Sequence, residues 1–129
     1  MQQLAFKAYS NVTQRTASDE QIEYALFRDI TEALQDVASK DSPPLTQWAD
    51  AVDRNLQLWT LLSADLMSPD NELDAGLKQG LLTLSESVRR LSYGVLAGNA
   101  ELDDLIEINE SIMTGLQTAA SIRKGGVAA

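Results

Sequence analysis

The sequence predicts an all-α protein, a compact antiparallel bundle of four main helices with a short N-terminal helical segment. Two observations predict this fold class. Apolar residues make up 44% of the 129-residue chain while aromatic residues make up only 5%, and such a composition suits helix packing better than sheet packing. Along four long stretches the apolar residues also recur three and four positions apart, which is the period of a helix that buries one face.

Residues 1–17 are expected to form the short N-terminal segment. Leu4, Ala8 and Val12 fall four positions apart, with Tyr9 beside them, so a short amphipathic helix is predicted. A helix of this length is only marginally stable without a surface to pack on. We therefore expect the segment either to dock on the bundle or to wait for a partner.

Residues 18–123 are expected to form the bundle, and its first helix begins at Ser18. Ser18 and Gln21 have the spacing of a capping box, in which the two side chains satisfy backbone donors of the first turn. The helix is expected to end near Lys40, because turn-forming residues follow it at 41–44. Its apolar stripe consists of Ile22, Leu26, Ile30, Ala33 and Val37, widened by Phe27 and Leu34.

The second helix is expected over residues 43–67 and is apolar on more than one side, because Leu58 and Leu61 lie beside its main stripe. One interpretation is a central helix covered by several neighbours. The other is an exposed groove for a partner helix, with contacts from Leu4, Tyr9 and Val12 in the N-terminal segment. The main stripe consists of Leu45, Trp48, Val52, Asn55, Trp59, Leu62 and Leu66.

Two further helices complete the predicted bundle, over residues 71–97 and 100–123. Gly98 stands where a helix commonly ends in a glycine, and Asn99 is expected to cap the last helix. Residues 124–129 read as a flexible tail. The stripe of the third helix consists of Leu73, Leu77, Leu81, Leu84, Val88, Leu91 and Val95, and that of the fourth of Leu102, Leu105, Asn109, Ile112, Leu116 and Ala119.

The connections between these helices are short, which favours an antiparallel bundle. A coiled-coil dimer is the alternative. Breaks at Pro or Gly every ~25–30 residues favour a chain that folds back on itself.

Composition excludes several classes of function. The chain carries a net charge of −9 and has neither His nor Cys. Nucleic acids and anionic membranes attract basic surfaces, and the basic pair Arg89 and Arg90 is better explained as a solvated helix face. Without His or Cys the chain lacks the commonest general base, the usual zinc ligands and any disulfide. We therefore expect no catalysis, metal or cofactor, and a cytoplasmic protein, since no apolar run is long enough for a signal peptide or a membrane span.

Two polar residues interrupt the apolar stripes. Asn55 lies between Val52 and Trp59 on the second helix, and Asn109 occupies the equivalent kind of position on the fourth. A buried Asn requires hydrogen-bond partners and is a device for fixing the register of packed helices. We interpret both residues as register or loop-anchoring positions, with direct partner contact as the alternative.

Three stretches occur in order along the chain, over residues 16–27, 55–60 and 106–116. Together they resemble the FlaF family of flagellar biosynthesis regulators, over about residues 5–117. The middle stretch is similar to that family's Asn-x-x-Leu-Trp-Thr pattern. One departure is Asp74, where family members often carry Pro after the leucine. The residues that carry the resemblance, with structural roles expected, are Ile22, Glu23, Asn55, Leu58, Trp59, Ile106, Asn109, Gly115 and Leu116.

The resemblance implies a function in flagellar assembly. It implies binding of flagellin, as a secretion chaperone or as a regulator of its synthesis, with promotion of export and filament formation. One alternative is post-transcriptional control of flagellin mRNA with the repressor FlbT, through protein contacts. A structural adaptor to the export apparatus is another. In each case the expected partners are proteins: flagellin first, then FlbT or export components.

Overall fold

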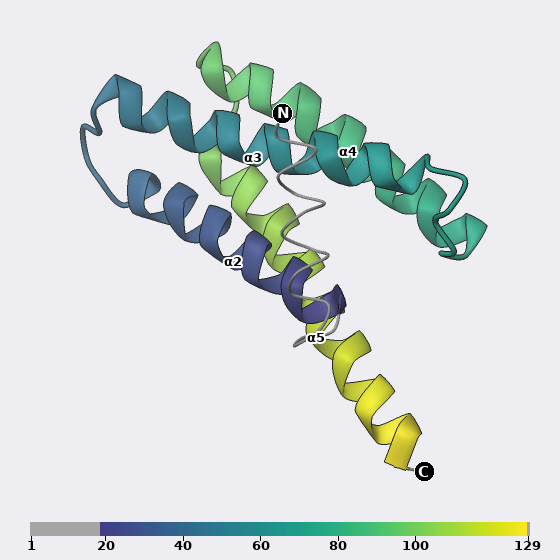
Figure 1. The fold of residues 1–129 in the computed structure, drawn as a ribbon. Helices are drawn as coiled ribbons and strands as arrows, with labels where there is room; N and C mark the ends of the chain where they lie inside the picture. Colours follow the sequence, from purple (N-terminus) through teal and green to yellow (C-terminus); the bar gives the residue numbers. More distant parts are fainter. Residues whose placement is uncertain (1–18, 129) are drawn as a thin grey trace.

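The computed structural model describes residues 19–128, which form four helices in chain order (Figure 1): α2 (Asp19–Ala38), α3 (Leu45–Leu66), α4 (Ala75–Leu96) and α5 (Leu102–Ala128). No strand occurs between residues 19 and 128. The all-α bundle predicted from the sequence is thus confirmed. The segment predicted over residues 1–17, with Leu4, Tyr9 and Val12, and the cap predicted at Ser18 lie outside the described residues.

The helices pack as a closed ring in which α2 contacts α3 and α5, and α4 contacts the same two helices. The most extensive contacts join α2 to α5 and α3 to α4. Figure 1 shows α3 and α4 as one antiparallel hairpin, with the α3–α4 connection and the C-terminal end of α5 projecting in different directions. None of the described helices combines the length and the apolar character needed to cross a membrane.

The α4–α5 connection is a complete Schellman motif. Gly98 has a φ of 82°, and its N–H donates to the Val95 carbonyl at 3.0 Å while the Asn99 N–H donates to the Gly94 carbonyl at 2.7 Å. The prediction that Gly98 ends the third helix is confirmed. The prediction that Asn99 caps the last helix is wrong, because its backbone N–H closes the preceding helix and α5 begins only at Leu102.

Other helix ends also differ from the predicted bounds. Helix α4 begins at Ala75 and not near residue 71, because the Asp74 carboxylate accepts hydrogen bonds from the N–H groups of Gly76 and Leu77 and caps the helix there. Helix α5 continues to Ala128, well past the end predicted at residue 123. The residues assigned to a flexible tail, 124–128, are therefore helical in the structure.

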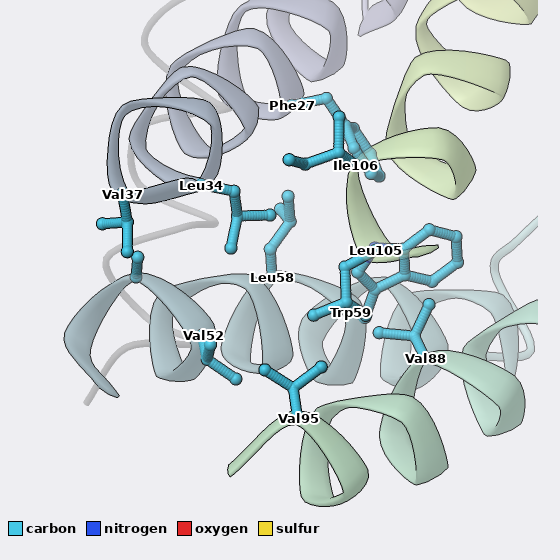
Figure 2. Close-up of a cluster of buried hydrophobic side chains, with 11 residues drawn as sticks. Phe27, Leu34, Val37, Val52, Leu58, Trp59, Val88, Val95, Leu105 and Ile106 are labelled. Carbon is cyan, nitrogen blue, oxygen red and sulfur yellow. The ribbon is translucent and has the colours of Figure 1, made fainter. Parts of the chain in front are cut away.

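The core lies where the four helices meet, and Figure 2 shows its side chains converging from all of them. Trp59 is buried in it, and Phe27 contacts the indole edge to face with ring centroids 5.6 Å apart. Such a pair adds about 0.5–1.5 kcal/mol beyond the burial of apolar area. The core cluster consists of Phe27, Leu34, Val37, Ala51, Val52, Leu58, Trp59, Val88, Val95, Leu105 and Ile106.

Three leucines of the predicted stripes are not covered by the described bundle. Leu45, Leu73 and Leu77 are exposed. Leu45 is the first residue of α3, and the other two lie at or just before the beginning of α4. All three have the correct period, but they stand at helix ends that extend beyond the neighbours that cover the middle of each helix.

Candidate functional site

A network of polar side chains crosses the core and joins three helices. Asn109 of α5 donates from its Nδ2 to Asn55 Oδ1 on α3 at 2.7 Å and to Thr31 Oγ1 on α2 at 3.0 Å. All three residues are buried. Hydrogen bonds made away from water are strong and depend on register. The network therefore fixes how α5 sits against α2 and α3.

Trp59 sets the direction of this network. Its indole Nε1–H donates to Asn109 Oδ1 at 2.9 Å. Because an indole N–H can only donate, the Asn109 amide must present its oxygen to Trp59 and its NH₂ group to the other side. Asn55 must then turn its oxygen toward Asn109 to accept, so one aromatic residue determines the orientation of both amides.

This orientation has a cost at Asn55. Its Nδ2 points away from Asn109, is buried, and has no hydrogen-bond partner within the described residues. A buried donor left unsatisfied costs about 1–3 kcal/mol. The network thus contains both the buried side-chain hydrogen bonds that link the helices and one unsatisfied donor.

A small surface groove lies directly outside this core, between α3 and α4. Its volume is about 210 Å³. Ser63 of α3 and Ser85 of α4 bond to each other in it, and the Ser63 hydroxyl donates to the Trp59 carbonyl at 2.9 Å. These hydroxyls hold α4 against α3. The groove is lined by Leu56, Trp59, Thr60, Ser63, Ser85, Glu86 and Arg89.

An exposed ion pair forms one side of the groove. Arg89 Nε donates to Glu86 Oε2 at 3.2 Å, one helical turn away. The hydrogen bond from Arg89 lowers the pKa of the Glu86 carboxyl below its usual range. The pair is solvent-exposed, so it adds little to stability, and it closes the groove with a charged edge.

The family model described as flagellar protein FlaF matches residues 5–116. The chain belongs to the FlaF family. No curated protein and no solved structure was found to match it. The family match spans α2, α3, α4 and the first half of α5, so it includes the whole buried network.

In this FlaF family protein, the structure joins three of the residues that carried the resemblance. Asn55, Trp59 and Asn109 come from two stretches far apart in the sequence and meet in one network. Ile106 is buried one turn before Asn109 on the same helix. Gly115 is exposed with open space around it. The side chains of Ile22, Glu23 and Leu116 lie outside the described residues.

Leu58 lies in the core. One of the two interpretations of its helix assigned it to an exposed groove for a partner helix, but only 6% of its surface is exposed and it belongs to the core cluster. Helix α3 contacts both α2 and α4, which is why a residue beside the main stripe is covered. Leu61 is half-buried. For Leu58, the burial agrees with the interpretation of this helix as a central helix covered by its neighbours.

Thr31 is the member of the network that the sequence analysis missed. The stripe predicted for the first helix was centred on Leu26, Ile30 and Ala33, which are only partly buried. The buried face runs instead through Phe27, Thr31 and Leu34, spaced four and three apart. The spacing of these three residues is visible in the sequence, but a Thr residue does not by itself mark a buried helix face.

Proposed function

We propose that this FlaF family protein binds flagellin in the cytoplasm, as a chaperone or regulator, and promotes its synthesis, export and assembly into filaments. The family match over residues 5–116 carries the proposal, because it assigns the chain to a family of flagellar proteins. The link to flagellin comes from the resemblance set out above.

Physical arguments support a binding function for the bundle. The terminal segments of flagellin are amphipathic helices that lack their packing partners before polymerisation. A helical protein with exposed apolar side chains offers such helices a surface to pack on. The net charge of −9 favours solubility of the carrier and disfavours nucleic acid as a direct ligand.

Binding, and not catalysis, is the proposed activity. The polar groups gathered in the core, Thr31, Asn55 and Asn109, bond to each other and are closed to solvent. Ser63 and Ser85, which open to the surface groove, serve as links between helices. These polar groups have structural partners, and the proposal assigns them no reaction and no cofactor.

Titration calorimetry of the full chain against purified flagellin tests the proposal, together with a pull-down from nuclease-treated and untreated lysates. The expected result is saturable binding to purified flagellin that nuclease does not affect. Capture of flagellin that disappears after nuclease treatment would favour control through mRNA. Absence of binding to purified flagellin, with capture of FlbT or export components instead, would contradict the proposal and favour a regulator or an adaptor.

A further inference from the structure

Three apolar side chains are exposed at the tip of the α3–α4 hairpin, the stretch from residue 65 to residue 78. Met67, Leu73 and Leu77 are 68%, 42% and 52% exposed. Figure 1 shows this tip at the end of the hairpin that projects past α2. The buried residues of α4 all lie in its C-terminal half. The tip therefore presents apolar surface that the described bundle does not cover, which is a mark of an interaction site.

The tip is held in one conformation by Asn71. The Asn71 side chain accepts from the Leu73 N–H at 3.0 Å and donates to Asp65 at 3.3 Å, while its carbonyl accepts from Lys78 Nζ at 2.6 Å. The connection thus ties the end of α3 to the first turns of α4. A surface ordered in advance loses little conformational entropy when a partner binds.

The same tip is acidic. Lys78 is the basic residue of this stretch, and its ammonium is directed to the Asn71 carbonyl. Among the described residues, the carboxylates of Asp70 and Glu72 form neither an ion pair nor a hydrogen bond. The exposed acidic residues of the tip are Asp65, Asp70, Glu72 and Asp74.

Apolar side chains surrounded by carboxylates complement a helix that carries Lys or Arg beside its apolar face. We propose that the tip of the α3–α4 hairpin is the surface on which this protein docks an amphipathic, basic-flanked helical segment of flagellin. The inference rests on the flagellin binding proposed above and adds the docking surface and the charge of the bound segment. A second copy of the chain fits this tip poorly, because two acidic tips repel each other.

The apolar part of the proposal is tested with the full-length double variant Met67→Gln with Leu77→Gln, titrated against purified flagellin. Its affinity is expected to fall about tenfold or more, as for apolar anchor residues at an interface. The matched control is Leu45→Gln with Leu96→Gln, since these leucines are 74% and 41% exposed but lie at the opposite end of the hairpin. The control is expected to bind as the wild type does, and melting curves check that both variants fold.

The charged part is tested with Asp70→Asn together with Glu72→Gln. Complementary charges bind more weakly as salt rises, so wild-type affinity is expected to fall between low and high salt. The variant is expected to bind several-fold more weakly at low salt and to show a flatter salt dependence. The control Glu32→Gln with Asp41→Asn makes the same change in net charge at exposed sites on α2 and after it, and is expected to keep the wild-type salt dependence.

The outcomes separate this inference from the proposed function. If wild-type protein binds flagellin and both tip variants bind equally well, the tip is not the docking surface, and flagellin binding stands. If the Leu45 and Leu96 control loses as much affinity as the tip variant, docking at the tip is also overturned. If the apolar tip variant binds flagellin more weakly but the charge variant binds as the wild type does, the bound segment does not carry the proposed basic flank. If wild-type protein does not bind flagellin at all, both proposals fall.

Discussion

At the scale of single residues, Trp59 has two separable roles, since its ring fills the core and its N–H orients Asn109. The substitution Trp59→Phe keeps most of the ring and leaves Asn109 Oδ1 without its donor, which is expected to cost about 1–3 kcal/mol. Trp59→Ala also leaves a cavity and is expected to cost about 3–5 kcal/mol. Urea unfolding curves measure both. Unchanged midpoints for Trp59→Phe would show that the indole hydrogen bond adds no stability.

The two asparagines are expected to act as a unit. Asn109→Leu leaves Asn55, Thr31 and Trp59 without their shared partner, while Asn55→Leu removes one acceptor and also the unsatisfied Nδ2. Because each side chain is the other's partner, a double-mutant cycle is expected to give a coupling energy of about 0.5–3 kcal/mol. Denaturant unfolding of the four proteins measures it. Additive effects would mean that the hydrogen bond does not couple α3 to α5.

Sequence reasoning placed Asn55, Trp59 and Asn109 on buried faces, because each lies between apolar residues at helical spacing in the middle part of its helix. It did not pair them, since a stripe gives the face of a helix and says nothing about which residue on another helix lies opposite. The unsatisfied Nδ2 of Asn55 was beyond prediction for a further reason. It follows from the direction that Trp59 imposes on Asn109, which exists only after the helices have packed.

At the scale of the helix, the substitution of alanine for glycine is expected to have opposite effects on stability at two positions. Gly98→Ala places a side chain at a φ of 82° and is expected to destabilise the protein by about 1–2 kcal/mol. Gly80→Ala adds a methyl group in open space within α4 and is expected to stabilise it by up to about 1 kcal/mol. Thermal melting distinguishes them. A stabilising Gly98→Ala would contradict the Schellman geometry.

Asp74 is expected to limit the length of α4. Its carboxylate accepts from two N–H groups of the first turn, at 3.0 and 3.3 Å, so Asp74→Ala is expected to cost about 1 kcal/mol. Asp74→Asn, which keeps a cap acceptor, serves as the control in the same melting experiment. If both variants have the same melting temperature as the wild type, the Asp74 cap does not stabilise the helix.

The predicted helix faces were more accurate than the predicted helix ends. Periodicity is an average over many residues, so the buried faces of α3 and α4 were predicted correctly although Leu45 and Leu77 are exposed. An end depends on one or two local hydrogen bonds. The Asp74 carboxylate caps α4, which begins four residues after the predicted start, and the Asn99 N–H bonds to α4 while α5 begins at Leu102. Neither hydrogen bond is visible in the spacing of apolar residues.

At the scale of the whole molecule, removal of residues 1–15 tests the predicted N-terminal segment. The core described here is built from α2, α3, α4 and α5, so the truncated protein is expected to remain folded. Its affinity for flagellin is expected to change, up or down, because the segment either covers or extends the binding surface. Titration calorimetry measures the affinity, with melting curves as the control. Equal affinities for two equally stable proteins would exclude the segment from binding.

The buried network also sets an order of events during synthesis of the chain. Asn109 lies on α5, and α5 has its most extensive contacts with α2, the first described helix. While the ribosome is still translating the second half of the sequence, Thr31, Asn55 and Trp59 have no Asn109 to bind, and the face of α2 that α5 covers is open. A chain that ends early exposes that face to proteases. The core of the bundle can therefore be completed only after the chain has been synthesised through Asn109 and this part of it has left the ribosome.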